Sequence, residues 1–148
     1  MHDPFAMRPF FGYNFGDYLR HWLDLGASLP ATVRPAMFMI NWFRRSSTTG
    51  GFLWPGFGEN IRVIDWIVRR AKGQVGAEVS PVGLVPARGD IALAGLDEEP
   101  DMEELMSTPA DFWVEEVEEM KNYFEEQVGR SLPQQMSQEL QSLRQRLN

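Results

Sequence analysis

The chain has no cysteine among its 148 residues, which excludes a disulfide framework and zinc sites built on thiolates. It also has no apolar run near the roughly 20 residues that a membrane span needs. Its first ten residues lack the basic-then-apolar layout of a signal peptide. Since the length suits a single domain, we expect one soluble, cytoplasmic domain with a real core.

Histidine and phosphate-binding motifs are scarce as well. The two histidines, His2 and His21, have no partner at metal-ligand spacing. No G-x-x-x-x-G-K-[ST] loop is present, and "GFGENI" lacks the third glycine of a dinucleotide fingerprint. The sequence therefore shows no self-sufficient catalytic site and no metal site.

Charge is distributed unevenly within the net −7. Residues 1–96 carry ten Lys and Arg against seven Asp and Glu, whereas residues 97–148 carry four against fourteen. The acidic total argues against non-specific nucleic-acid binding. The mildly basic first part can still attract a small anion.

Periodicity predicts helices over 14–25, ended by Gly26, and from Asn60, as N-cap, to Gly73. In the second of these, four apolar side chains fall on one face: Ile61, Ile64, Ile67 and Val68. Two C-terminal helices are predicted at about 108–128, capped by Ser107 or Thr108, and 131–147. Trp113, Val117, Met120 and Phe124 form the apolar stripe of the first.

The remaining segments predict strands and a linker. "AMFMINWF" (36–43) is a continuous apolar run and is predicted to be a buried strand. Residues 78–96 favour short strands, and 97–107 form an acidic linker. The predicted fold class is therefore mixed α/β, with several helices, one buried strand and further short strands.

Residues 41–60, "NWFRRSSTTGGFLWPGFGEN", alternate large rings with turn-forming residues. Phe43, Phe52 and Phe57 are separated by glycines and a proline, so the backbone can fold back and bring the rings together. The amides at the start of the helix after Phe57 lack intrahelical partners. A planar heterocycle with carbonyl oxygens suits such a pocket. The alternative is that the phenylalanines are core residues.

Several motifs resemble the GTP-dependent phosphoenolpyruvate carboxykinases: "HDPFAMRPFFGYNFGDYLRHW", "NWFRR", "FLWPGFGEN" and "PVGLVPARGDIALAGL". The resemblance covers the whole chain and corresponds to about the last quarter of that enzyme. It implies the C-terminal part of a nucleotide-binding lobe. The reaction implied is that of a carboxy-lyase, a decarboxylase of gluconeogenesis that converts oxaloacetate and GTP to phosphoenolpyruvate, GDP and carbon dioxide.

The resemblance also implies roles for particular residues. Phe43, Phe52 and Phe57, with Trp42 beside them, would line the guanine pocket, and Asn60 would read the edge of the base. Phe10 would lie near the organic-acid site. Apart from the resemblance, Arg44 and Arg45 are candidates for holding an attached anion, with a solvated surface position as the alternative for at least one of them. The family uses Mn²⁺ at the active site and Mg²⁺ with the nucleotide.

Two departures from the family pattern qualify these expectations. The turn "SSTTGG" replaces an acidic, charged turn and is about one residue longer. The family's phosphate loop, metal ligands and oxaloacetate-binding arginines lie upstream of Met1, so we expect a C-terminal fragment that is inactive alone.

The expected partners are a guanine nucleotide and the missing N-terminal portion, with no nucleic acid and no membrane, in a monomeric complete enzyme. The alternative is a non-enzymatic interaction module with an acidic helical surface.

Overall fold

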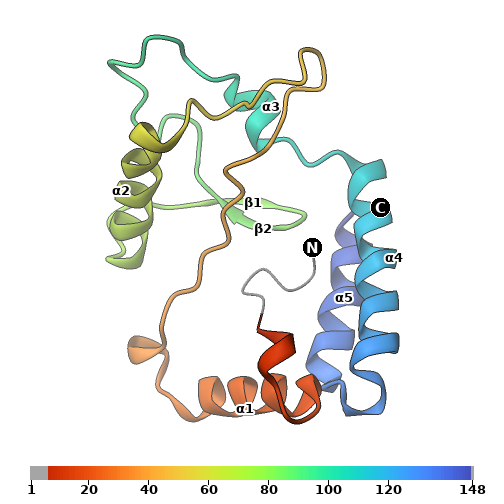
Figure 1. Cartoon of the computed structure of the whole chain (residues 1–148). Coiled ribbons are helices and arrows are strands. Elements are labelled where there is room, and N and C mark those ends of the chain that lie inside the picture. The colour runs from red at the N-terminus through yellow and green to blue at the C-terminus, as the bar shows by residue number, and fades with distance from the viewer. Residues whose placement is uncertain (1–6, 148) are drawn as a thin grey trace. The chain divides into compact units, whose positions relative to one another are not determined.

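The computed structural model describes residues 7–147 and is mostly helical, with one small antiparallel sheet. This is a mixed architecture compatible with the predicted α/β class. The chain divides into two compact units (Figure 1). Unit 1 combines the chain up to Pro35 with the chain from Pro109 onward, and unit 2 is Ala36–Thr108.

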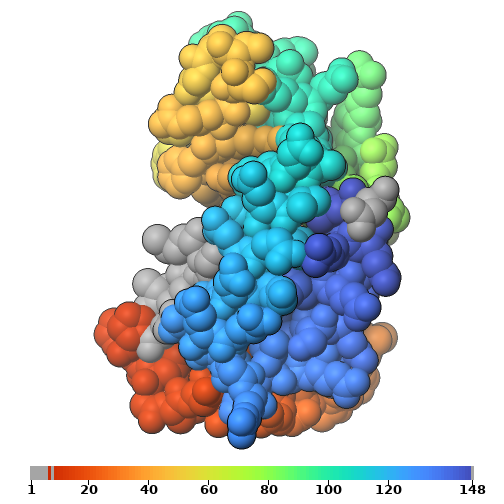
Figure 2. All heavy atoms as spheres, turned by 90° about the vertical axis from the view of Figure 1, so that its right-hand side faces the viewer, coloured from red at the N-terminus to blue at the C-terminus, as the bar shows by residue number. Residues whose placement is uncertain are grey.

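Unit 1 consists mainly of three helices: α1 (Phe15–Ser28), α4 (Ala110–Gln127) and α5 (Gln134–Leu147), with short 3-10 turns η1 (Arg8–Phe10), η2 (Ala31–Val33) and η4 (Gly129–Ser131). Helices α4 and α5 run side by side in opposite directions (Figure 1), and the space-filling view shows their atoms lying against one another (Figure 2). The predicted stripe on α4 is confirmed, because its four side chains are buried or half-buried.

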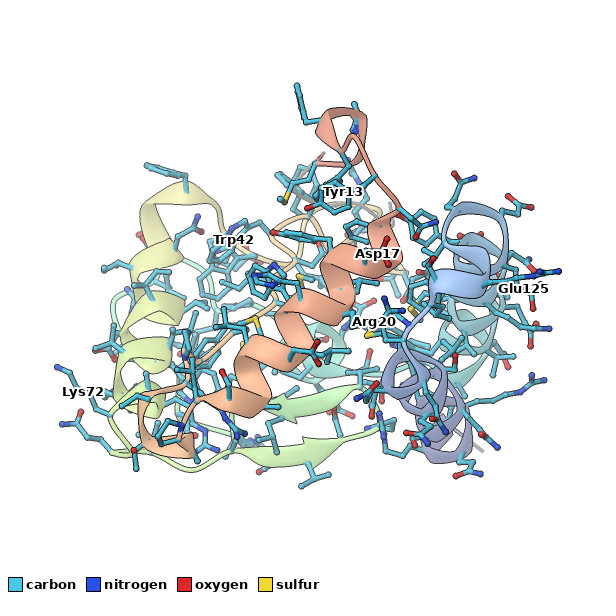
Figure 3. All side chains as sticks on the ribbon, turned by 90° about the horizontal axis from the view of Figure 1, so that it is seen from below. Tyr13, Asp17, Arg20, Trp42, Lys72 and Glu125 are labelled. Carbon is cyan, nitrogen blue, oxygen red and sulfur yellow. The ribbon has the colours of Figure 1, made fainter. Side chains whose placement is uncertain are left out.

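Asn14 fastens α1 to the α4–α5 connection. Its Oδ1 accepts the Gly16 N–H at 2.7 Å, which caps the helix, and its Nδ2 donates to the Val128 carbonyl at 3.1 Å. Arg20, labelled in Figure 3, donates to the Ser131 carbonyl at 3.1 Å and pairs with Asp17 at 2.9 Å. The Asn14 side chain thus caps the start of α1 and also satisfies the Val128 carbonyl.

The end of α1 differs from the prediction, because the helix continues through Gly26 to Ser28. An interior glycine costs only about 1 kcal/mol relative to alanine, so it does not force a stop. The stop comes from Pro30, which disfavours helical backbone at the residue before it. Leu29 is accordingly extended, with φ −91° and ψ 138°.

Unit 2 contains α2 (Asn60–Ala71), preceded by the 3-10 turn η3 (Phe57–Glu59), and a hairpin of β1 (Glu78–Ser80) and β2 (Gly83–Val85). The hairpin confirms the short strands predicted here. The core is Trp54, Trp66 and Ile91, with half-buried side chains around it. Trp66 is the buried side chain of α2. Of the four apolar side chains predicted on one face, Ile67 packs against the core, whereas Ile61, Ile64 and Val68 are exposed.

The C-terminus of α2 is as predicted, with Gly73 in the left-handed region at φ 69°. The Gly73 N–H donates to the Arg70 carbonyl, and the Gln74 N–H donates to the Arg69 carbonyl. These two bonds form a Schellman motif, which satisfies carbonyls that the helix itself leaves unpaired. Lys72 lies at this end of the helix and points away from it (Figure 3).

The prediction of a buried strand at 36–43 is wrong for the chain as it stands. Residues 36–40 run extended without a ladder partner among the described residues, and Met37 and Met39 are 78% and 83% exposed. A continuous apolar run is typical of a strand covered on both faces. One face makes contact through Phe38, whose ring meets the core residue Trp66 edge to face with centroids 6.0 Å apart. The other face, with Met37 and Met39, finds no such cover within unit 2.

The predicted acidic linker contains a short helix, α3 (Met102–Met106). The Asp101 carboxylate accepts the Glu104 N–H at 2.9 Å and caps its start. Ser107 does not cap α4, because its hydroxyl donates to the Glu104 carbonyl at 2.8 Å and so closes α3 instead. Helix α4 begins after Pro109 without a side-chain cap.

Candidate guanine-binding site

The aromatic–glycine segment folds into a tight hairpin within unit 2. An antiparallel bridge pairs Arg45 with Phe52, and the Leu53 N–H donates to the Arg44 carbonyl at 2.9 Å. The Ser46 N–H donates to the Gly51 carbonyl at 2.8 Å, and the Ser46 hydroxyl accepts amides within the turn. The chain therefore reverses through "SSTTGG" as the turn chemistry predicts.

This reversal brings Phe43 and Phe52 together. Their ring centroids lie 6.0 Å apart at an interplanar angle of 62°, an edge-to-face pair. They are 71% and 55% exposed, so the hairpin presents the two rings instead of burying them. The alternative prediction, that these phenylalanines belong to the core, is wrong.

Phe57 lies apart from this pair. It is 92% exposed and makes no ring contact with another aromatic side chain of residues 7–147. Beside it is a hollow of about 390 Å³, formed by the turn from Pro55 to Glu59 and by Leu96, Asp97 and Glu98. The structure therefore assembles two of the three predicted rings and places the third on the rim of a separate hollow.

Asn60 is held by an indole. The buried Trp54 donates from Nε1 to the Asn60 Oδ1 at 2.9 Å, and Trp42 packs against Trp54 with centroids 6.3 Å apart. Because an indole N–H can only donate, the amide oxygen must face Trp54. The amide Nδ2, a donor, is the end that Asn60 can offer to a ligand.

Asn60 does not act as the N-cap that the sequence predicted. It is the first residue of α2, with helical φ −58° and ψ −27°. Its N–H donates to the Phe57 carbonyl, and the Glu59 N–H donates to the Gly56 carbonyl at 3.1 Å. The 3-10 turn supplies these acceptors, so the two amides are not free for a ligand.

The two arginines have structural partners. The Arg44 guanidinium donates to the carbonyls of Leu105 and Ser107 at 2.8 Å each and to the Ser107 hydroxyl at 2.6 Å. The Arg45 Cζ lies 4.2 Å from the centroid of the Phe52 ring, and its Nη1 donates to the Gly50 carbonyl at 2.8 Å. Both side chains therefore hold the hairpin instead of standing ready for an anion.

Glu104 is a residue of this site that sequence reasoning missed. Its Oε1 accepts the Ser47 N–H at 2.6 Å, across 57 positions of sequence. Hydrogen bonds from the Ser47 backbone and side chain, opposed by desolvation and aided by Ser46 and Arg44, hold the pKa of Glu104 below its ordinary value. The carboxylate is therefore ionised at neutral pH. No local sequence pattern signals such a contact.

Comparison with known proteins identifies the family of this chain. The profile described as "Phosphoenolpyruvate carboxykinase C-terminal P-loop domain" matches residues 1–146. The chain belongs to this family. The resemblance drawn from the sequence is confirmed.

Three relatives show how much of the carboxykinase the chain represents. It is 51% identical to human mitochondrial phosphoenolpyruvate carboxykinase [GTP] over 148 residues, covering all of this chain and 23% of that protein. It is 49% identical to the cytosolic [GTP] enzyme of Bos taurus, again covering 23% of it. The Ascaris suum phosphoenolpyruvate carboxykinase [GTP] is 50% identical, with 99% of this chain and 22% of that protein covered. The chain thus spans less than a quarter of these relatives.

Phe10, which the family resemblance associates with the organic-acid site, belongs to unit 1. It ends η1, and its side chain is exposed. The other candidate residues lie in unit 2. The role of Phe10 near the organic-acid site stays a prediction.

The metals that the carboxykinase family implies do not fit the residues described here. Residues 7–147 contain no group of three His, Cys, Asp or Glu side chains that could hold a metal ion. None of the helices in the same residues has the length and apolar character to cross a bilayer.

Proposed function

We propose that this chain provides guanine recognition for a GTP-dependent phosphoenolpyruvate carboxykinase, a carboxy-lyase that converts oxaloacetate and GTP to phosphoenolpyruvate, GDP and carbon dioxide. Its partners are then a guanine nucleotide and the remainder of that enzyme, which holds Mn²⁺ and Mg²⁺. The observation that carries the proposal is the exposed Phe43–Phe52 pair on a hairpin of a carboxykinase family member. Exposed rings are otherwise costly to leave in water.

In this proposal, different residues stack on the base and recognise its edge. The rings of Phe43 and Phe52 offer apolar surface to a planar base, and stacking of this kind contributes about 1–3 kcal/mol per base. Asn60 then offers Nδ2 as a donor, because Trp54 holds its oxygen. Guanine presents a carbonyl oxygen where adenine presents an amino group, so a donor favours guanine.

The hollow beside Phe57 is unsuited to the phosphates of the nucleotide. Three carboxylates line it, those of Glu59, Asp97 and Glu98. Negative charge of this kind repels a triphosphate. In this proposal, the phosphates therefore extend away from this rim.

The cellular compartment is also part of the proposal. The relatives include a mitochondrial and a cytosolic carboxykinase. We propose the cytoplasm, as the sequence predicted.

A nucleotide titration of the 148-residue chain tests guanine recognition. We expect GDP and GTP at millimolar concentration to raise the thermal midpoint and ATP to have a smaller effect. Affinity will be weak because the family's phosphate loop is not in this chain. No shift with any nucleotide would contradict the proposal and favour the interaction-module alternative.

Two variants separate stacking from edge reading. Phe52→Ala removes one ring and should weaken GDP and ATP alike, and in the complete enzyme it should raise the KM for GTP. Asn60→Asp keeps an acceptor for the Trp54 indole but replaces the Nδ2 donor, so it should weaken GDP by about tenfold or more without a matching loss for ATP. An unchanged guanine preference in Asn60→Asp would exclude Asn60 from the site.

A further inference from the structure

Helix α3 contacts the hairpin at two places. At the tip, the Glu104 carboxylate accepts the Ser47 N–H at 2.6 Å. At the base, Arg44 donates three hydrogen bonds to the C-terminal end of α3, at Leu105 and Ser107. Arg44 and Ser47, at the two ends of the first arm of the hairpin, are therefore both hydrogen-bonded to the α3 segment.

These contacts control the part of the hairpin that carries the rings. Phe43 directly precedes Arg44, and Phe52 is bridged to Arg45. A hairpin tip fixed by Glu104 limits how far the two sides can separate or slide. The 6.0 Å spacing of the Phe43 and Phe52 rings depends on that register.

The hydrogen bond from Ser47 goes to a charged acceptor, and such bonds are shorter and stronger than neutral ones. The turn itself is closed by local bonds: Ser46 pairs with Gly50 and Gly51 through the backbone, and its hydroxyl accepts amides within the turn. Ser46 is half-buried and the rest of the turn is exposed. Exposed local bonds open readily. Glu104 provides the long-range anchor that these local bonds lack.

We infer that Glu104 is a positioning residue for guanine recognition: its carboxylate holds the Ser46–Gly51 turn against α3 and thereby keeps the Phe43 and Phe52 rings paired. This inference rests on the proposed function for its nucleotide part. The anchoring part stands on the contacts of unit 2 alone. Glu104 touches no nucleotide in this scheme and acts through the hairpin.

The test uses Glu104→Ala with Glu103→Ala as its matched control, because Glu103 lies on the same helix and is exposed. Hydrogen exchange followed by mass spectrometry on the 148-residue chain reports the amides of residues 44–53. We expect Glu104→Ala to exchange about threefold to tenfold faster there, and Glu103→Ala to match the parent. Far-UV circular dichroism checks that both variants keep their helices.

GDP titration of the same proteins provides the second readout. Glu104→Ala should weaken GDP binding severalfold, while Glu103→Ala should not. Glu104→Gln retains a carbonyl acceptor without the charge, so it should fall between the parent and Glu104→Ala in both measurements. This graded rescue is not expected if Glu104 is only a surface side chain.

The outcomes are distinct. Unchanged exchange in Glu104→Ala would overturn the anchoring role and the inference with it. Faster exchange with unchanged GDP affinity would overturn the positioning role. Faster exchange in a chain whose parent form binds no GDP would overturn the proposed function and leave the anchoring role supported.

Discussion

Two glycines of α1 show how much a single methyl group can matter in this chain. Gly16 is buried, and a Cβ atom there would lie 2.6 Å from the Ser131 carbonyl carbon and 2.8 Å from the Val128 Cγ1. Gly26, on the same helix, has nothing within 4 Å of the same position. Close approach to a backbone carbonyl therefore requires glycine at the first site only.

At the residue scale, we predict opposite effects for the two alanine substitutions. Gly16→Ala should lower the free energy of unfolding by about 1–3 kcal/mol, because backbone atoms of the α4–α5 connection must move. Gly26→Ala should raise it by about 0.5–1 kcal/mol through lost freedom of the unfolded chain. Urea denaturation followed by circular dichroism measures both. Equal effects would mean that the packing at Gly16 is not what holds α1.

The pairing of α4 with α5 is the main packing contact between long elements. Val117 is only 3% exposed, and Arg144 reaches from α5 to Glu118 on α4 at 2.7 Å. A hollow of about 330 Å³, lined mainly by side chains of these helices, remains between them. Because the ion pair is exposed, the apolar contact dominates the stability of this pair.

At the element scale, Val117→Ala should cost about 2 kcal/mol, since two buried carbons are lost next to an existing hollow. Val114→Ala is the matched control, because Val114 lies one turn earlier on α4 and is exposed. Its effect should stay within about 0.5 kcal/mol. Thermal unfolding of both variants beside the parent decides the point, and a similar loss in both would contradict the packing argument.

At the scale of the whole molecule, the chain leaves apolar surface without cover. Met37 and Met39 on the extended segment, and Ile61 on α2, are exposed in the described structure. A chain that spans 23% of its relatives is expected to expose faces that pack elsewhere in the longer protein. The segment 36–40, which has no ladder, is the clearest case.

Limited proteolysis tests that interpretation. Chymotrypsin should cut the 148-residue chain first within 36–43, because extended backbone without a ladder fits a protease groove. Cleavage after Phe124 should be slower, because α4 must unfold first. Resistance of 36–43 comparable to that of Phe124 would show that the segment is covered after all.

Local chemistry explains what could be predicted from the sequence. The start of α1 near Asn14 and the end of α2 at Gly73 follow from signals within a few residues, and both are confirmed. The hairpin's turn and its paired Phe43 and Phe52 also follow from nearby glycines. The end of α1 was misplaced because the prediction stopped the helix at Gly26 and did not consider Pro30.

The other errors and omissions involve contacts that no short sequence pattern specifies. A strand at 36–43 needs partners that periodicity cannot supply. The bond from Trp54 turns the Asn60 oxygen away from a capping role, and the contact of Glu104 with Ser47 joins residues 57 positions apart. Such contacts depend on tertiary packing, which no local pattern encodes.

The guanidinium of Arg45 above Phe52 has a consequence for any incoming base. A flat, delocalised cation covers an aromatic face much as a heterocycle does. The Arg45 side chain therefore competes with an incoming base for a face of the Phe52 ring. A purine must stack on the opposite face of the Phe52 ring or displace the Arg45 guanidinium. In the second case, part of the stacking energy only replaces the cation–π interaction that the protein makes without a ligand.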